Sequence, residues 1–526
     1  MHHLLSQRPV EEGILILDYG SQYTLLIARR LRELGIYAEI IDGVAEKPPA
    51  DFDFHGIVLS GGPDSVNTNG ARVLPRWVLD SNKPVLGICY GMQLLAQAFG
   101  GELRSGHSRE YGKAELHLAK RDDTPWLAAF SELPETQTVW MSHGDDVANL
   151  ADDFAIVGRT DGHVVAAVVH TKRPLIGLQF HPEVHHSNYG MQLLDIFSRK
   201  ICGAQLNWKA DDVMQATHDY VRQTVGDGKV LMAVSGGVDS TVAVVLLSQA
   251  LGAEHVKAVF VDHGLLRKDE AIWVSQKIKD LGVDLETLDR RAVFYEALHG
   301  VSDPEEKRKI IGRKFIEEFE DYAKSHQYLK FTHLGQGTLY PDVIESAGHG
   351  SGAKVIKSHH NVGGLPEKLH LQLVEPFRFL FKDEVRLVGR KLGIPEDLVG
   401  RHPFPGPGLA VRILGEISPE KVAILQQADD IFIRRLKESG LYDEVWQAFA
   451  VLLPVKSVGV MGDNRTYQWT CALRAVTATD GMTAGVGDLP MSFLVSVSDE
   501  IVRKVDGINR VVYDVTTKPP ATIEWE

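Results

Sequence analysis

Cysteine is scarce in this sequence: Cys89, Cys202 and Cys471 are the only three among 526 residues. So few cysteines in a chain of this length exclude the disulfide framework typical of small secreted proteins. We therefore expect the chain to work in a reducing cytoplasm. Its length allows two to four domains with sizeable hydrophobic cores.

Long apolar runs and an excess of positive charge are also missing. No run of about eighteen apolar residues occurs, so we expect no membrane span. The first twenty residues lack the basic start and long apolar centre of a signal peptide. The formal net charge of −14 argues against a protein that wraps nucleic acid, although a local basic pocket could still bind phosphate groups.

Short apolar runs that end in glycine-rich turns are present instead, and they alternate with helical patterns at the start of the chain. Residues 13–20, 56–63 and 84–91 are expected to be strands, and residues 23–35 a helix. This alternation is typical of an α/β fold with a mostly parallel sheet. Ligands of such sheets gather at the carboxyl ends of the strands, where all three turns fall.

A second α/β pattern begins at residues 229–240, and proline-rich residues 401–412 interrupt it. Its further expected strands are 256–264, 283–289 and 328–337. The remainder mixes a helix at 421–440 with strand-like runs at 493–499 and 509–516. We predict two consecutive α/β domains, 12–202 and 203–401, followed by a smaller α+β domain, 402–526.

Cys89 lies in "GICYGMQ", between an apolar strand and a helix, with a glycine two residues away on each side. Taken alone, it could be a buried small hydrophobic residue. A nucleophile elbow, however, needs glycines on both flanks so that strand and helix can pass close together. It also places the thiol at a helix N-terminus, where the helix dipole favours the thiolate.

A thiol nucleophile needs a base and a group that orients the base, and "FHPEV" contains both. His181 and Glu183 are two residues apart in an extended stretch, so their side chains can share a face. The backbone N–H of Tyr90 would face an oxyanion on the attacked carbonyl, and Gly62 in "SGGP" could supply a second donor.

The segment "VLMAVSGGVDS" is a buried strand that leads into a loop of small residues before an apolar helix. Such a loop lets backbone N–H groups converge on an anion at the helix N-terminus, and serine hydroxyls add donors. The loop residues are Ser235, Gly236, Gly237, Val238, Asp239 and Ser240. The pattern differs from G-x-x-x-x-G-K-[ST], so a Walker-type nucleotide site is not indicated.

Residues 12–202 resemble a class I glutamine amidotransferase domain, through "LDYGSQYT", "LSGGPDSV", "GICYGMQ", "MSHGDDV" and "GLQFHPEV". The resemblance implies that Cys89 attacks the side-chain amide of glutamine, with His181 as the base and Glu183 as its orienter. The expected products are glutamate and ammonia.

The loop at 235–240 resembles the PP-loop of adenine nucleotide α-hydrolase-like domains, which split ATP into AMP and pyrophosphate. Asp239 is then the expected magnesium ligand. Val261 and Asp262 resemble the neighbouring strand that lines the adenine and ribose pocket. Lys382 is expected to reach the ATP phosphates, unless it is an ordinary charge at a helix start.

Over nearly its whole length the chain resembles the bacterial GMP synthetase family, glutamine-hydrolysing. The segments that carry this resemblance are 305–315, 334–346, 356–366, 401–412, 455–467 and 518–526. It implies that XMP is adenylated and then aminated to GMP, and that the protein is a homodimer formed through the C-terminal domain. Arg308, Asp463, Lys518 and Glu524 are expected to contact XMP. The stretch "KSHHNVGG" within 356–366 could be a mobile lid, because a histidine pair and glycines suit a loop. His263 stands where many relatives carry asparagine.

Other PP-loop enzymes are the alternatives, namely a glutamine-dependent NAD synthetase or a tRNA-thiolating enzyme. A tRNA thiolase should have a basic face and reactive cysteines in its ATP domain, whereas Cys202 and Cys471 fall outside 210–400. A third alternative is a binding protein with an inactive amidotransferase fold. Such a chain is expected to have lost Cys89, His181 or Asp239.

Overall fold

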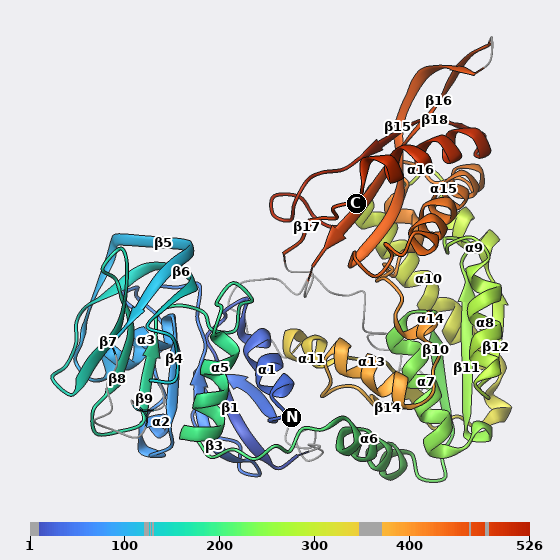
Figure 1. The fold of residues 1–526 in the computed structure, drawn as a ribbon. Coiled ribbons are helices and arrows are strands. Elements are labelled where there is room, and N and C mark those ends of the chain that lie inside the picture. Colours follow the sequence, from blue (N-terminus) through green and yellow to red (C-terminus); the bar gives the residue numbers. More distant parts are fainter. Residues whose placement is uncertain are drawn as a thin grey trace. The chain divides into compact units, whose positions relative to one another are not determined.

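The structure is a computed structural model that describes residues 10–119, 126, 128, 131–346, 371–461, 464–478 and 483–526. It divides into two compact units, which are described separately (Figure 1). The first unit comprises Met1–Thr217 with Leu339–Ile356, and the second comprises His218–Thr338 with Lys357–Glu526. The predicted domain boundaries after residues 202 and 401 stay predictions.

The first unit is built on a nine-stranded sheet in the order β2-β1-β3-β4-β9-β8-β7-β5-β6. Pairing is parallel from β2 to β9 and antiparallel from β9 to β6. The strands are β1 (Glu12–Asp18), β2 (Ala38–Asp42), β3 (Asp53–Leu59), β4 (Val85–Ile88), β5 (Glu102–Leu118), β6 (Thr136–Asn149), β7 (Phe154–Thr160), β8 (Val165–His170) and β9 (Leu175–Leu178).

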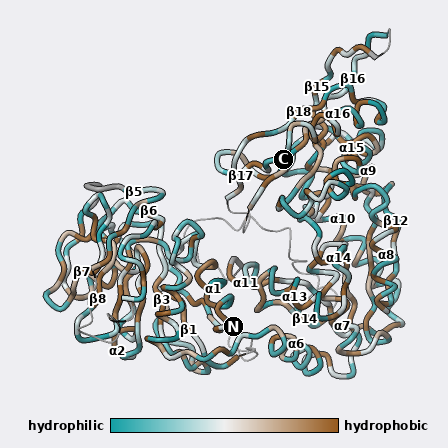
Figure 2. Tube along the Cα trace, in the orientation of Figure 1, coloured by the Kyte–Doolittle hydropathy of each residue, from teal (hydrophilic) through white to brown (hydrophobic). Residues whose placement is uncertain are grey.

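Helices accompany the parallel half of this sheet: α1 (Thr24–Glu33), α2 (Arg76–Asp80), α3 (Tyr90–Ala98), α5 (Gly190–Asp195) and the π-helical turn η1 (Ile196–Ile201). Two more helices are α6 (Ala210–Val225), which crosses into the second unit, and α11 (Tyr340–Ser346). Residues 14–17 of β1 are fully buried, as expected for a strand with both faces covered, and the trace there is coloured as hydrophobic in Figure 2.

The second unit contains a five-stranded parallel sheet in the order β12-β11-β10-β13-β14. Its strands are β10 (Val230–Val234), β11 (Val256–Asp262), β12 (Asp284–Asp289), β13 (His333–Gly335) and β14 (Gln372–Val374). The strand expected at 328–337 is shorter than predicted, because Gln327–Leu329 forms the 3-10 turn η3.

Helices between these strands are α7 (Val238–Leu251), α8 (Glu270–Asp280), α9 (Arg291–Ala297) and α10 (Pro304–Ser325), with the 3-10 turn η2 (Ala253–His255). After β14 the chain forms α13 (Lys382–Lys391), α14 (Glu396–Val399) and the 3-10 turn η4 (Gly408–Arg412). Helix α10 has a capped N-terminus. The Asp303 side chain accepts a hydrogen bond from the Glu306 N–H, and Pro304 occupies the first turn.

The C-terminal part of this unit is α+β, as predicted. A second sheet contains β15 (Gln447–Met461), β16 (Asn464–Thr477), β17 (Gly485–Val486) and β18 (Ile508–Tyr513), and two helices accompany it, α15 (Pro419–Glu438) and α16 (Met491–Lys504). The prediction of a strand at 493–499 is wrong, since these residues lie in α16. Phe493, Val497 and Ile501 are buried at a spacing of four, so helical periodicity decides their conformation.

No helix among the described residues is long and apolar enough to cross a membrane. The two α/β domains and the α+β domain otherwise follow the predicted fold class.

Candidate active sites

Cys89 sits at a sharp turn between β4 and α3, with φ 53° and ψ −105°. A positive φ is strained for a residue with a side chain, at a cost of roughly 1–3 kcal/mol. The flanking glycines make the turn sterically feasible. A Cβ on Gly91 would lie 2.4 Å from the Leu59 carbonyl oxygen, and one on Gly87 would lie 2.5 Å from that of Gly91. The structure therefore shows the elbow that the sequence predicted.

His181 and Glu183 lie in the loop after β9, and both are buried. His181 Nδ1 is 2.7 Å from Glu183 Oε1. Burial lowers the pKa of His181, but the Glu183 charge and the hydrogen bonds to Cys89 and Glu183 outweigh it and hold this pKa well above its ordinary value. The three residues that the sequence predicted as nucleophile, base and orienting carboxylate therefore lie in contact with one another.

The "SGGP" turn after β3 lies against both halves of this site. A Cβ on Gly61 would be 3.1 Å from His181 Cε1, and one on Gly62 would be 3.2 Å from Tyr90 Cγ. Gly62 therefore lies beside the first residue of α3, where the sequence predicted a pair of oxyanion donors.

Helix α1 also supports the catalytic loop, a role that the sequence did not indicate. The Tyr23 ring packs edge-on against His181 with ring centroids 4.9 Å apart. Arg30 Nε donates to the Glu183 carbonyl oxygen at 3.1 Å. The motif "LDYGSQYT" was the available signal for Tyr23, because it runs from the end of β1 to the first residue of α1 and contains this tyrosine.

The predicted phosphate loop follows β10 in the second unit, and α7 begins at Val238. Gly236 has φ +78°, a conformation that favours glycine. The loop closes on itself through serine hydroxyls: Ser235 Oγ is 3.1 Å from Ser240 Oγ, and Gly237 N–H donates to Ser235 Oγ at 3.3 Å. The expected turn of small residues at a helix N-terminus is therefore present.

Asp239 lies in the first turn of α7 and Lys382 begins α13, and the two are adjacent in space. Lys382 Nζ is 3.4 Å from Asp239 Oδ2. Asp239 Oδ1 is buried and has no hydrogen-bond partner among the described residues. Lys382 therefore lies next to the predicted phosphate loop, as a contact with the ATP phosphates requires. It is also the first residue of α13, so both descriptions of this lysine hold for the structure.

Val261 and Asp262 end β11, the parallel neighbour of β10. Val261 is buried, and Asp262 Oδ1 accepts the Gly264 N–H at 2.9 Å. From the proline-rich segment, Arg401 Nη1 donates to the Gly236 carbonyl oxygen at 3.0 Å. Burial lowers the pKa of Arg401 to about 10. Sequence reasoning missed this arginine, because only folding brings residue 401 to the loop.

Three of the four residues predicted to bind XMP lie among the described residues, and Asp463 and the loop 356–366 lie outside them. Arg308 Nη1 donates to Glu305 Oε1 at 2.8 Å and pairs with the main-chain oxygen of Glu526. Glu524 accepts two hydrogen bonds from Arg412, at 3.0 and 2.8 Å. The Lys518 backbone pairs with Ala484. The segment 518–526 is therefore tied to the body of the unit.

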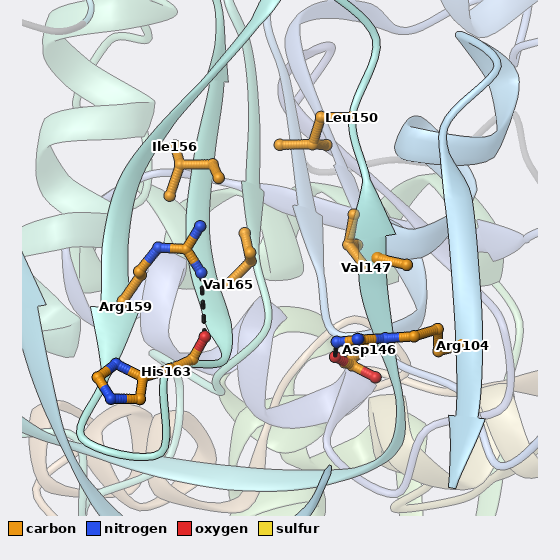
Figure 3. Close-up of a pocket in the computed structure, with 9 residues that line it drawn as sticks. Arg104, Asp146, Val147, Leu150, Ile156, Arg159, His163 and Val165 are labelled. Carbon is orange, nitrogen blue, oxygen red and sulfur yellow. Dashed lines mark hydrogen bonds and ion pairs between the residues drawn. The ribbon is translucent and has the colours of Figure 1, made fainter. Parts of the chain in front are cut away.

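Two cavities lie apart from the predicted residues. One, of about 310 Å³, is lined partly by Arg386, Arg401 and His402. The other, of about 100 Å³, lies in the first unit (Figure 3). In this smaller cavity Arg104 pairs with Asp146 at 2.6 Å, and Arg159 donates to the His163 carbonyl oxygen at 3.0 Å. None of the residues predicted to act at either site lines the smaller cavity, and we assign it no ligand.

Comparison with known proteins covers the chain almost end to end. Family models match for glutamine amidotransferase class-I at residues 15–201, NAD synthase at 210–310 and the GMP synthase C terminal domain at 434–525. The chain is 50% identical over 519 residues to a glutamine-hydrolysing GMP synthase of Aquifex aeolicus, covering 98% of this chain and 99% of that protein. It is 51% identical over 525 residues to one of Chlorobium limicola, covering 98% and 100%.

Proposed function

The chain belongs to the family of glutamine-hydrolysing GMP synthases, and from that premise we propose how its residues divide the reaction between two sites. It is a carbon–nitrogen ligase that uses ATP and takes its nitrogen from glutamine. One site, around Cys89, releases ammonia. The other, around the loop 235–240, activates XMP so that ammonia can replace an oxygen.

At the first site the Cys89 thiol gives its proton to His181, and the sulfur attacks the side-chain carbonyl of glutamine. The N–H groups of Tyr90 and Gly62 stabilise the oxyanion. The C–N bond breaks, His181 protonates the leaving nitrogen, and ammonia departs. Water then cleaves the thioester, which releases glutamate and restores the thiol. The His181–Glu183 contact of 2.7 Å beside a strained Cys89 is the observation that carries this proposal.

At the second site the loop Ser235–Ser240 holds the ATP phosphates, with Lys382 beside it and Val261 at the adenine side. The XMP C2 oxygen attacks the α-phosphorus, and pyrophosphate leaves. Ammonia then adds at C2, and AMP departs with the oxygen, giving GMP. The N-terminus of α7 and the loop amides favour the negative charge of the phosphates.

Asp239 is the residue that we propose to hold Mg²⁺. Its buried Oδ1, without a hydrogen-bond partner among the described residues, suits a hard cation that prefers carboxylate oxygen. The bound ion would neutralise charge on the departing pyrophosphate.

We propose that XMP is bound by Arg308, Lys518, Glu524 and Asp463. We also propose that the protein is a homodimer formed through the C-terminal domain. Arg308 is a charge-assisted donor suited to a phosphate. The anchoring of 518–526 supports the assignment, because Lys518 and Glu524 then have a defined place.

The scarcity of cysteine in the chain supports the proposal that the protein works in the cytoplasm. Burial raises the pKa of Cys471 to about 12, which argues against a reactive thiol there and so against a tRNA thiolase.

Replacing the nucleophile tests the division into two sites. Cys89→Ala should abolish GMP synthesis from glutamine, because no sulfur remains to form the thioester, and should leave synthesis from added ammonium intact. Cys202→Ala is the matched control and should keep both activities, since Cys202 packs against Gly56 away from the elbow. If ammonium does not rescue Cys89→Ala, the two sites are not separable in this way.

Replacing the magnesium ligand tests the second site. Asp239→Ala should lose pyrophosphate release with either nitrogen source, by about a hundredfold or more, because the charge on pyrophosphate is then uncompensated. Asp284→Ala, an exposed aspartate on β12, is the control and should change little. Sustained pyrophosphate release by Asp239→Ala would remove this residue from the ATP site.

A further inference from the structure

Two buried glutamine side chains, Gln179 and Gln93, form a hydrogen-bonded chain that ends at the sulfur of Cys89. Gln179 follows β9, two residues before His181, and is fully buried. Its backbone is fixed by a hydrogen bond from its N–H to the Ala166 carbonyl oxygen at 2.9 Å. Gln93 comes from α3, one turn after Cys89, and is 3% exposed.

The hydrogen-bond network determines which way each amide points. Gln93 Nε2 lies 3.1 Å from the main-chain oxygen of Asp145, which can only accept, so the NH₂ group of Gln93 must face it. The same nitrogen is 3.4 Å from Gln179 Oε1 and donates its second hydrogen there. Gln179 is thereby left with its NH₂ group toward Cys89, and Nε2 is 3.6 Å from Sγ.

The sulfur of Cys89 thus has two polar neighbours with opposite preferences. The Ser142 carbonyl oxygen, 3.6 Å away, can only accept, so it favours the protonated thiol. The Gln179 amide can donate, so it favours the thiolate. The titratable groups that face this sulfur are His181 and, in contact with His181, Glu183. The charge of His181 also lowers the pKa of His143.

We propose that Gln179 is a further catalytic residue of the glutaminase reaction, whose side-chain amide donates a hydrogen bond to the Cys89 thiolate. The thiolate forms twice in each turnover. It forms first when the S–H proton passes to His181, and again when water breaks the C–S bond of the thioester and the electron pair returns to sulfur. Gln179 stabilises the anion at both points. This inference rests on the proposed role of Cys89.

The test is the pH dependence of Cys89 alkylation by iodoacetamide in the full-length enzyme, together with glutamine-driven and ammonium-driven synthesis. Gln179→Met keeps the length of the side chain and removes the donor. A hydrogen bond to a charged group corresponds to roughly a ten- to hundredfold effect. We expect slower alkylation at neutral pH, a profile shifted to higher pH, and a kcat for glutamine lowered to that extent with ammonium-driven synthesis unchanged.

Gln137→Met is the matched control, since Gln137 is a buried glutamine on β6 of the same sheet. It should alkylate as the unaltered enzyme does. Gln179→Glu keeps the shape of the side chain and replaces the donor by an acceptor, so it should shift the profile further than methionine does. This variant decides the question if Gln179→Met also loses ammonium-driven synthesis.

An alkylation profile that overlays that of the unaltered enzyme in both Gln179 variants overturns the inference and leaves the proposed function standing. Failure of ammonium to rescue Cys89→Ala overturns the proposed function, and with it the premise of this inference.

Discussion

His263 is a neutral histidine enclosed by aromatic rings, at the end of β11. Its ring centroid is 5.6 Å from that of Phe294 and 5.1 Å from that of Phe315, and Nδ1 accepts the Leu265 N–H at 3.1 Å. Burial lowers the pKa of His263 to about 4. The unfolded chain binds a proton near pH 6.5, whereas the folded chain does not bind it until about pH 4. Stability is therefore lost as the pH falls between these values.

His263→Asn should flatten this acid sensitivity, because asparagine can accept the Leu265 N–H without titrating. From pH 7 to pH 5 the histidine costs about 2 kcal/mol of folding free energy. Between pH 7 and pH 5 the free energy of unfolding should therefore fall by about 2 kcal/mol less in the variant than in the unaltered protein. Urea unfolding of the second unit at both pH values measures this difference. Equal losses in the two proteins would show that His263 is already charged when folded.

At the scale of an element, residues 522–526 are held by three buried cations from distant parts of the second unit. Arg474 donates to the carbonyl oxygens of Thr522 and Ile523, at 2.9 and 2.8 Å, and Arg412 holds Glu524. Lys307, fully buried in α10, pairs with the Glu526 carboxylate and donates to the Ile413 carbonyl oxygen at 2.8 Å. The segment that carries the proposed XMP residues is thus a structural part of the unit.

Lys307→Met should release this segment, because the Glu526 carboxylate would lose its buried partner. Breaking a buried ion pair from one side costs about 3–5 kcal/mol. We expect lower stability of the second unit and a raised KM for XMP, measured by pyrophosphate release. The rate of Cys89 alkylation, which reports on the first unit, should be unchanged. Lys309→Met, exposed on the same helix, is the control. An unaltered KM for XMP would separate the anchoring of this segment from the nucleotide site.

At the scale of the whole molecule, the ribbon formed by β15 and β16 extends beyond α15 and α16 (Figure 1). Val458 pairs with Tyr467 across the ribbon, and Val460 lies two residues further on the same face. These side chains are 44%, 66% and 76% exposed. A two-stranded ribbon that exposes these apolar side chains is marginally stable by itself, so a second copy of the chain is the proposed partner.

A double variant, Val458→Glu with Val460→Glu, should weaken the proposed dimer by placing charge on this face. We expect the mass measured by light scattering to fall to that of one chain, 58.2 kDa, at micromolar concentration. Val73→Glu, exposed in the first unit, should leave the mass unchanged. A double variant that stays dimeric would place the dimer interface elsewhere.

The fold class and the two reactive turns can be predicted from the sequence alone. Each of three groups spans only a few residues of the sequence: Cys89 with its flanking glycines, His181 with Glu183, and the loop 235–240. Local backbone geometry and side-chain size therefore favour each of these turns, whereas the contact between Cys89 and His181 depends on the fold of the sheet. Local pattern was insufficient at 493–499, where alternating apolar residues belong to a helix because the same residues also repeat every four positions.

Contacts made across long sequence separations could not be predicted in this way and depend on the folded core. Gln179 meets the Cys89 sulfur from 90 residues away, and Lys307 meets Glu526 from 219. Sheet register and helix packing set these distances, and both depend on the burial of many side chains at once. A single sequence gives the chemical character of such residues, but it does not show which of them the folded core brings into contact.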